Sequence, residues 1–432
     1  MELISKKIDK LAGKATPPAS KSQTIRALLL ATLAKGDSVL HNVLISDDTN
    51  SAITACVNMG AKIERQEKNL LVSSLGANLL ETTKKINSGN SGITTRFILP
   101  VLGLRKNCEE EIILDCGEQM KGRPLTSLID ALNNLGMKVG SINKNGTCPL
   151  KVNKNLGGGN AVVDGITSQY LSALLMSLPC AKNDSEIIVE DLCERPYMEM
   201  TLQWLDLLKI NYDYARDGNL DRYTIKGRQT YHYFEKSIPG DFSSASYLIA
   251  AGCLLPGQIE LNGLDMNDLQ GDKELVNILQ SMGADIRIDG LKMVITGGKE
   301  LVGKTIDCNN IPDMVPTLAV IGAVATGKTE LTNVKQARIK ETDRLHSMSE
   351  GLAKMGVKIE EKEDGLVIHQ SELVGTKVDG FEDHRTVMAL ALAGMIAKGQ
   401  TIINTAESIN KTFPNYIELM NNIGANMKII NK

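Results

Sequence analysis

The chain has 432 residues, of which 42% are hydrophobic and 23% are charged, and its formal net charge is −3. This length exceeds what one hydrophobic core usually serves, so we expect two domains or one long repeat array. The composition excludes a mostly disordered chain or a coiled coil. Because the charge is nearly balanced, no global positive field is available to recruit nucleic acid.

The N-terminal segment MELISKKIDKLAGK alternates apolar and charged residues. It lacks the apolar core of a signal peptide and the Arg/Ser-rich composition of a transit peptide. The apolar run ALLLATLA that follows is too short to cross a membrane. We therefore expect a cytoplasmic protein without a membrane partner.

The eight cysteines show neither C-x-x-C spacing nor a zinc-like pairing with histidine. They are interpreted as reduced, mostly buried thiols, and no metal site is expected. Their positions are Cys56, Cys108, Cys116, Cys148, Cys180, Cys193, Cys253 and Cys308.

Two phrases recur along the chain. The first, such as IRALLLATLAKGDSVLHNV and VMALALAGMIAKGQTIINT, predicts an apolar helix, a glycine turn and a strand, and it occurs six times. The second, such as VNMGAKIE and LAKMGVKIE, predicts an amphipathic helix that ends at glycine before a strand. The glycines that end these amphipathic helices lie about 70 residues apart. The spacing is about twice as long at one place, where a further copy of the phrase, LDLLKINYDY, has no glycine. The glycines are Gly60, Gly136, Gly283, Gly356 and Gly424.

A helix that turns sharply into a strand favours a left-handed residue just after its end, which explains these glycines. Each repeat therefore contains one buried helix, one half-exposed helix and several short strands. Six repeats predict two domains of three repeats. The break is expected near Ser237–Gly240, which follows the third repeat and contains Pro-Gly.

Polar residues precede the predicted helices, and many of them are ordinary helix caps. Lys21, Arg123, Lys340, Arg385 and Lys411 do not fit that interpretation. A cation at a helix N-terminus opposes the helix dipole and costs roughly 0.3–1 kcal/mol. Free backbone N–H groups beside Lys or Arg form an anion site, so we expect helix N-termini to face bound anions across a cleft between the domains.

Spacing adds two pairs to this set. Ser22 and Arg26 are four residues apart, as are Lys340 and Arg344, so each pair is predicted to share one helix face.

The segment Gly322–Thr329 matches the P-loop pattern G-x-x-x-x-G-K-[ST]. A P-loop follows a strand and opens a helix, whereas this segment is predicted to close an apolar helix and enter a strand. A nucleotide site is therefore not expected here.

Taken together, nine segments in this order resemble the EPSP synthase family of enolpyruvyl transferases over nearly the whole chain. They are PPASKSQTIRALLLATLAKG, SGNSGITTRF, GRPLTSLIDAL, TSQYLSALLM, PGDFSSASYLIAA, IPDMVPTLAV, RIKETDRL, EDHRTVMALALAG and NKTFPNY. The resemblance implies an α/β fold, a two-domain inside-out barrel in which each domain has three βαβαββ repeats. The expected domains are 15–237, and 1–14 with 238–432 closed by the N-terminal strand, with the active site in the cleft between them.

The family transfers the carboxyvinyl group of phosphoenolpyruvate to the 5-hydroxyl of 3-phosphoshikimate, by addition and elimination, in chorismate and aromatic amino acid biosynthesis. The resemblance implies Asp313, Glu341 and Lys21 as catalytic residues. Its 3-phosphoshikimate ligands would be Lys21, Ser22, Arg26, Thr167, Ser168, Gln169, Arg195, Asp313, Gln336 and Lys340. Its phosphoenolpyruvate ligands would be Lys21, Gly92, Arg123, Gln169, Arg344, Arg385 and Lys411.

Asp313 matches the carboxylate that accepts the hydroxyl proton, and as a base it would be ionised but weak. Arginine suits these substrates because its planar fork binds two oxygens at once. Lys21 and Glu341 are both candidate proton donors, and the sequence does not assign the steps between them. The resemblance implies no cofactor, no metal and no macromolecular partner, and we expect a monomer. With no side chain at Gly92, the pocket is expected to admit glyphosate, the inhibitor of the family.

Two positions depart from the family pattern. Glu194 stands where the family has the Ser of a Ser-Lys-Pro-Tyr motif, and Arg195 replaces the Lys. An acid beside a bound phosphate would repel it, so Glu194 is not expected to be a ligand, and Arg195 is the candidate substitute. Gln336 replaces an Asn of the family.

Three other protein classes compete with this interpretation. The UDP-N-acetylglucosamine enolpyruvyl transferase shares its fold and chemistry with the EPSP synthase family. Its first motif is Ala-Lys-Asn, and one of its loops carries a reactive cysteine. This chain has Ser20-Lys21-Ser22 and a loop, GEQMKGRP, without cysteine. An RNA-end cyclase would need a histidine nucleophile, for which His384 is the candidate. A non-enzymatic repeat scaffold would not explain the cations at helix N-termini.

Overall fold

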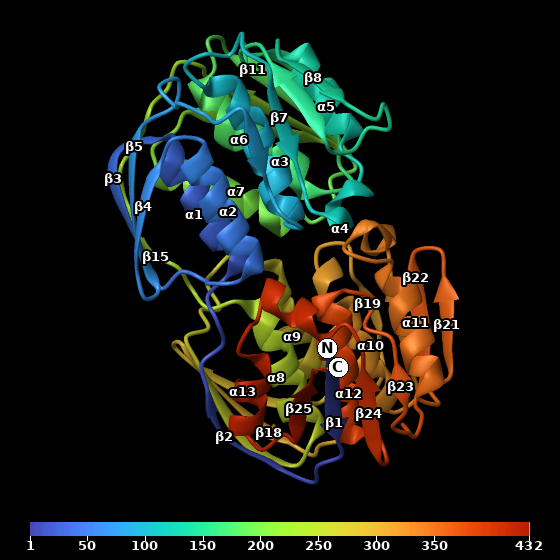
Figure 1. Cartoon of the computed structure of the whole chain (residues 1–432). Coiled ribbons are helices and arrows are strands. Elements are labelled where there is room, and N and C mark those ends of the chain that lie inside the picture. The colour runs from blue at the N-terminus through green and yellow to red at the C-terminus, as the bar shows by residue number, and fades with distance from the viewer. Residues whose placement is uncertain (432) are drawn as a thin grey trace. The chain divides into compact units, whose positions relative to one another are not determined.

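A computed structural model describes residues 1–431, and the chain divides into two compact units (Figure 1). Unit 1 comprises Met1–Ser20 and Pro239–Lys432, and unit 2 comprises Lys21–Ile238. The chain therefore starts in unit 1, builds the whole of unit 2, and returns.

Unit 2 contains three sheets, with strand orders β14-β3-β5-β4 (β15 also pairing with β3), β6-β7-β9-β8 and β10-β11-β13-β12. The strands are β3 (Ala34–His41), β4 (Lys62–Gln66), β5 (Asn69–Leu75), β6 (Lys85–Asn87), β7 (Ile112–Asp115), β8 (Lys138–Ser141), β9 (Leu150–Asn153), β10 (Gly159–Asp164), β11 (Ser185–Glu190), β12 (Tyr212–Asp217), β13 (Leu220–Ile225), β14 (Tyr231–His232) and β15 (Glu235–Ser237). The helices are α1 (Lys21–Leu33), α2 (Asp47–Asn58), α3 (Gly92–Val101), α4 (Glu118–Lys121), α5 (Thr126–Asn134), α6 (Ser168–Ser177) and α7 (Arg195–Leu207), with 3-10 turns η1 (Leu102–Leu104) and η2 (Leu178–Cys180).

Unit 1 repeats this plan, with strand orders β17-β18-β16-β2, β19-β20-β22-β21 and β23-β24-β1-β25. The strands are β1 (Glu2–Lys6), β2 (Leu11–Ala15), β16 (Gly257–Asn262), β17 (Asp285–Asp289), β18 (Lys292–Gly297), β19 (Thr305–Asp307), β20 (Lys328–Thr332), β21 (Ile359–Lys362), β22 (Gly365–His369), β23 (Lys377–Val378), β24 (Gln400–Ile403) and β25 (Met427–Ile430). The helices are α8 (Phe242–Leu254), α9 (Glu274–Met282), α10 (Val315–Val324), α11 (Arg344–Lys354), α12 (His384–Ile396) and α13 (Tyr416–Asn422), with 3-10 turns η3 (Gly271–Lys273), η4 (Pro312–Met314), η5 (Lys335–Ile339) and η6 (Ala406–Lys411).

The sheets show one repeat with chain order βαβαββ. In the second repeat of unit 2, β6 pairs in parallel with β7, and β7 pairs antiparallel with β9, the second strand of a hairpin. Strands from the two ends of the sequence complete two sheets of unit 1. Strand β2 pairs in parallel with β16, and β1 lies antiparallel between β24 and β25.

The core of each unit is a set of three apolar helices, α1, α3 and α6 in unit 2 and α8, α10 and α12 in unit 1. Every residue from Val315 to Ala323 of α10 is buried, as is all of α3. The other long helices are amphipathic and bury one face. Helices inside and sheets outside confirm the predicted inside-out α/β architecture of three repeats per unit.

The repeat glycines have the predicted backbone conformation. The φ angles of Gly60, Gly136, Gly283, Gly356 and Gly424 lie between +91° and +113°. In the copy that lacks glycine, Lys209 takes the same place after α7 with φ +57°. A left-handed backbone is unfavourable for a residue with a Cβ, so Lys209 is a strained position of the fold.

Other local predictions had mixed outcomes. All eight cysteines are buried and free of disulfides, as predicted. The P-loop-like segment follows α10 and enters β20, which confirms that it is not a P-loop. The predicted shared helix face of Lys340 and Arg344 is wrong, because Lys340 and the next residues bend before α11 begins at Arg344.

Replacing Lys209 by glycine should raise the free energy of unfolding by about 0.5–1 kcal/mol. Glycine removes the strain of the left-handed backbone in the folded state. It also gives the unfolded chain more conformational freedom, which offsets part of this gain. Lys209 is exposed, so no packing is lost. The measurement is urea unfolding of the wild type and the variant. Lys209→Ala, which keeps a Cβ, should show no gain, and Gly356→Ala (φ +91°) should lose about 1 kcal/mol. A destabilised Lys209→Gly would contradict the interpretation.

Candidate active site

An arginine–carboxylate cluster lies in unit 1 where η4, α11 and α12 begin. Arg344 donates to Asp313 (Nη1–Oδ1, 2.6 Å), to Glu341 (Nη2–Oε2, 2.6 Å) and to Asp383 (Nε–Oδ2, 3.0 Å). Arg385 donates to the second oxygen of Asp313 (Nη2–Oδ2, 2.7 Å). Asp313 is therefore held between two guanidinium groups, one on each carboxylate oxygen.

The two arginines of this cluster are more buried than Asp313 and Glu341, with which they pair. The side chains of Arg344 and Arg385 are 1% and 5% exposed, whereas those of Asp313 and Glu341 are 20% and 15% exposed. Burial alone would raise the pKa of Asp313, but Arg385, Arg344 and Lys340 outweigh it and hold that pKa well below the usual range. The carboxylate is ionised at neutral pH, and each of its oxygens accepts from one of the two arginines.

Asp383 fixes the orientation of both arginines. Its Oδ1 atom accepts from the backbone N–H groups of Arg385 (2.7 Å) and Thr386 (3.0 Å), which caps α12. Its other oxygen accepts from Arg344. Because Asp383 is fully buried, this one carboxylate sets the start of α12 and the direction of the Arg344 fork.

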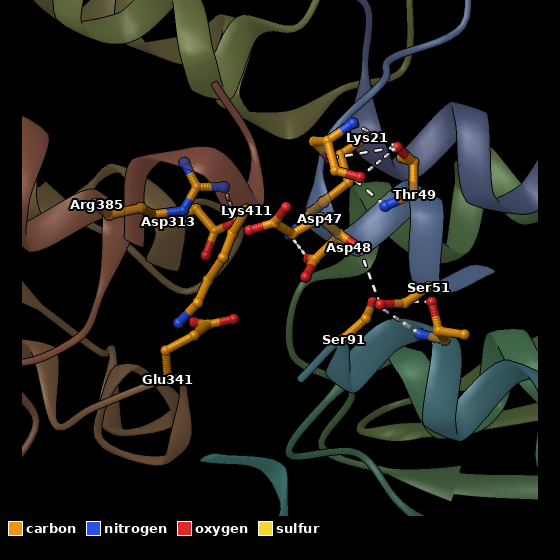
Figure 2. Close-up of polar contacts among 12 residues, drawn as sticks. Lys21, Asp47, Asp48, Thr49, Ser51, Ser91, Asp313, Glu341, Arg385 and Lys411 are labelled. Atoms are coloured by element: carbon orange, nitrogen blue, oxygen red, sulfur yellow. Dashed lines mark hydrogen bonds and ion pairs between the residues drawn. The ribbon is translucent and has the colours of Figure 1, made fainter. Parts of the chain in front are cut away.

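The two lysines predicted for this unit are near the same cluster. The positive charge of Lys340 acts on Asp313. Lys411 ends η6 and donates to the carbonyl oxygen of Glu382 (2.8 Å). Figure 2 shows the Lys411 side chain running toward Glu341, beside Asp313 and Arg385. Gln336 is buried, and it donates to the carbonyl oxygen of Asn309 (2.9 Å), which is not a member of the arginine–carboxylate cluster.

A further carboxyl group, which the sequence reasoning missed, lies behind Asp313. Asp272 in η3 is 1% exposed and accepts a short hydrogen bond from Ser243 in the first turn of α8. Burial, followed by the negative charge of Asp313, raises the pKa of Asp272 to about 7, against the opposing effect of Arg385. Its only sequence signal was a Gly-Asp pair before a helix, which is also typical of a simple cap.

In unit 2, Lys21 opens α1 and pairs with Asp48 in the first turn of α2 (Nζ–Oδ2, 3.1 Å; Figure 2). The two side chains are 15% and 8% exposed. The carboxylate thus offsets the unfavourable position of a lysine at a helix N-terminus. Ser22 follows in the same turn, and its carbonyl oxygen accepts from Arg26 (3.2 Å).

Arg26 is buried between three helices. It donates to Thr201 (2.8 Å), to the hydroxyl of Ser172 (3.2 Å) and to the carbonyl oxygen of Tyr197 (2.8 Å). Burial lowers its pKa to about 10, against the raising effect of Tyr197 and Glu194. These contacts connect α1 with α6 and α7, so Arg26 carries positive charge into the core of the unit.

The start of α3 is shaped by its glycine. A Cβ added at Gly92 would lie 2.4 Å from Nη1 of Arg123 and 3.0 Å from Nη1 of Arg96. Two guanidinium groups therefore lie against the backbone of this helix start. Arg96 also donates to Gln169 (Nη1–Oε1, 2.7 Å), which connects α3 with α6.

Arg96 is a residue that the sequence reasoning missed. Burial, followed by the nearby charge of Arg123, lowers its pKa to about 10. An arginine inside the mostly apolar run ITTRFILPVLGL is a signal that could have identified it.

Glu194 directly precedes α7, but its side chain lies at the N-terminus of α6. Its Oε2 atom accepts from the hydroxyl of Thr167 (3.3 Å) and from the backbone N–H (3.2 Å) and hydroxyl (3.0 Å) of Ser168. Arg195, the predicted substitute ligand, instead forms a two-pronged pair with the fully buried Asp221 (2.9 and 2.7 Å). The departure from the family pattern therefore has a structural consequence at both positions.

Two general features of the residues 1–431 concern partners. None of the helices there is long and apolar enough to span a membrane. Among the same residues, no group of three or more His, Cys, Asp or Glu side chains is arranged to hold a metal ion.

A family model described as EPSP synthase (3-phosphoshikimate 1-carboxyvinyltransferase) matches residues 5–420. The chain belongs to the EPSP synthase family. A 3-phosphoshikimate 1-carboxyvinyltransferase of Acetivibrio thermocellus is 45% identical over 425 residues, covering 98% of this chain and 99% of that protein. One of Methanococcus maripaludis is 39% identical over 432 residues, covering 99% and 100%.

The fold has a match of known structure. An EPSP synthase structure from Acinetobacter baumannii superposes with a TM-score of 0.82 at 23% identity, covering 100% of both chains. These findings confirm the resemblance and the fold class predicted from the sequence.

Asp272 should make this EPSP synthase family member less stable as the pH rises. Its pKa is about 7 when folded and near 3.8 when unfolded, so between these values the folded protein holds a proton that the unfolded chain has released. The free energy of unfolding therefore falls from pH 4 to pH 7, by on the order of 4 kcal/mol. Asp272→Asn should lack this loss, as measured by urea unfolding at pH 5 and pH 8.

The matched control is Asp289→Asn, since Asp289 is exposed and lies in the same unit. It should follow the wild type at both pH values. Equal pH dependence in Asp272→Asn and the wild type would show that Asp272 is not the titrating group.

Proposed function

We propose that this protein transfers the carboxyvinyl group of phosphoenolpyruvate to the 5-hydroxyl of 3-phosphoshikimate. The products are 5-O-(1-carboxyvinyl)-3-phosphoshikimate and phosphate, and the step belongs to chorismate and aromatic amino acid biosynthesis. Family membership and the names of relatives that cover the whole chain support this proposal.

The single observation that carries the chemistry is the placement of Asp313 between Arg344 and Arg385. Two buried guanidinium groups suit an anionic substrate, and the carboxylate between them is a base at the same point. A scaffold protein has no need for this combination. A phosphoryl enol acid that reacts with a hydroxyl group needs both.

We assign phosphoenolpyruvate to five cations, one glycine and one glutamine, which come from both units. They are Lys21, Gly92, Arg123, Gln169, Arg344, Arg385 and Lys411. The acceptor, 3-phosphoshikimate, is assigned to polar side chains and cations that border this set. They are Lys21, Ser22, Arg26, Thr167, Ser168, Gln169, Arg195, Asp313, Gln336 and Lys340. We propose that residues of both units serve one reaction in this way.

The proposed reaction has two stages. In the addition, the 5-hydroxyl oxygen bonds to C2 of phosphoenolpyruvate, Asp313 takes the hydroxyl proton, and C3 receives a proton from Glu341 or Lys21. In the elimination, C3 returns a proton, the bond from C2 to the phosphate oxygen breaks, and phosphate leaves. Each stage moves one proton to or from carbon, so a group poised beside C3 is required.

The arginines couple binding to basicity. In the present structure they hold the pKa of Asp313 low, which makes it a poor base. An anion that binds Arg344 and Arg385 competes for their N–H groups and weakens their hold on Asp313. Its pKa then rises toward the range in which it accepts the hydroxyl proton.

A UDP-N-acetylglucosamine acceptor is not favoured. The family model and the relatives name the shikimate reaction, and the loop that contains α4 carries no cysteine between Gly117 and Pro124. We further propose that the enzyme acts as a monomer in the cytoplasm, which size-exclusion chromatography and cell fractionation would test.

The deciding experiment measures phosphate release from phosphoenolpyruvate by the purified protein. Release should require 3-phosphoshikimate and should not occur with UDP-N-acetylglucosamine. Asp313→Asn keeps the shape of the side chain but removes the base, so kcat should fall by about 10²–10⁴. Circular dichroism would check that the variant is folded. Release with the UDP-sugar alone would overturn the proposed acceptor, and full activity of Asp313→Asn would remove it as the base.

Gly92→Ala should weaken phosphoenolpyruvate binding and glyphosate inhibition together. The added Cβ would lie 2.4 Å from a guanidinium nitrogen of Arg123, so that side chain must move. We expect about a tenfold or greater rise in both KM and the inhibition constant, because an arginine contact to an anion is lost or bent. Gly122→Ala is the control, since its Cβ would meet no atom within 4 Å. Unchanged glyphosate sensitivity in Gly92→Ala would contradict the assignment of Gly92.

A further inference from the structure

The contacts of the Glu194 carboxylate include three with groups at one helix start that can bind an anion. The donors are the hydroxyl of Thr167, the backbone N–H of Ser168 and the hydroxyl of Ser168, at 3.0–3.3 Å from Oε2. Glu194 is 2% exposed. A negative group at a helix N-terminus is stabilised by the helix dipole and by unsatisfied N–H groups.

The local backbone conformation directs the Glu194 side chain toward α6 and away from α7, the helix that follows it in the chain. It precedes α7 but makes no side-chain cap to it, and its φ and ψ are +55° and +37°, in the left-handed region. A residue with a Cβ adopts this conformation only where other contacts favour it. The contacts with Thr167 and Ser168 supply them.

Buried arginines reinforce the position. The negative charge of Glu194 acts on both Arg26 and Arg96, opposing the effect of burial on their pKa values. The neighbouring Arg195 is engaged by Asp221. Glu194 therefore supplies negative charge to a helix start and to two buried cations, which are features that suit an incoming phosphate group.

We propose that Glu194 sets the affinity for the phosphate-bearing acceptor, because its own carboxylate competes with the acceptor's phosphate for Thr167 and Ser168. This inference rests on the proposed function, which assigns these two residues to 3-phosphoshikimate. Two anions do not share the same three donors, so the substrate phosphate displaces the carboxylate when it binds. The acceptor is thus bound more weakly than the donors alone would allow, while phosphoenolpyruvate is not affected.

The first test is Glu194→Gln, which keeps the length and an acceptor oxygen for Ser168 but removes the charge. The KM for 3-phosphoshikimate should fall about tenfold or more, because a neutral amide competes poorly for charge-assisted donors. The KM for phosphoenolpyruvate should stay within about twofold. Glu199→Gln is the matched control, since Glu199 is an exposed glutamate of the same helix α7, and its kinetic constants should equal those of the wild type.

A second measurement keeps the test independent of folding losses. Ser168→Ala should weaken 3-phosphoshikimate binding, measured by titration calorimetry, more in the Glu194→Gln background than in the wild type. This difference arises because in the wild type the removed hydroxyl was engaged by Glu194 before the substrate arrived. Equal effects of Ser168→Ala in the two backgrounds would show that Glu194 and the substrate do not compete.

The two proposals fail in different ways. If the wild type releases no phosphate in the presence of 3-phosphoshikimate, the proposed function fails. If the wild type is active and Glu194→Gln shows an equal or higher KM for 3-phosphoshikimate, the competition fails and Glu194 is only a counter-ion for the buried arginines.

Discussion

The proposed site depends on one electrostatic feature: negative charge balances the buried guanidinium groups beside it. In unit 1, Arg344 and Arg385 are partnered by Asp313 and Asp383, and in unit 2 the charge of Glu194 acts on Arg26 and Arg96. These carboxylates lie at helix starts, where the helix dipole also favours negative charge. The substrates we propose are anions, so binding them is an exchange of one negative partner for another.

The repeat explains why such charges gather. Each βαβαββ repeat places a buried helix at the same place in its unit, so residues far apart in sequence meet at the helix starts. Asp313, Arg344 and Arg385 come from η4, α11 and α12 and form one cluster. The strands β1 and β2 complete sheets of unit 1 from the other end of the chain, and they help to position the helices that carry the cluster.

The sequence was sufficient for the features that one repeat determines. The left-handed glycines, the apolar helices and the rejection of the P-loop all follow from local pattern, and the structure agrees with them. It was not sufficient for partner choice. Arg195 remains a predicted ligand, but the sequence did not reveal that it pairs with Asp221, a strand residue 26 positions further along the chain. The start of α11 was misplaced because Lys340 lies in a bend that a helical spacing rule does not detect.

Glu194 shows why a departure from a family pattern is informative. From sequence, an acid beside a phosphate site could only be judged unfavourable. The structure shows that this acid accepts hydrogen bonds from Thr167 and Ser168, which is the observation behind the proposed competition for those donors. The left-handed backbone at Glu194 is part of the same arrangement, since it turns the side chain from α7 toward α6. In this proposal, a residue that accepts these hydrogen bonds before the substrate arrives weakens the binding of the substrate, because both need the same donors.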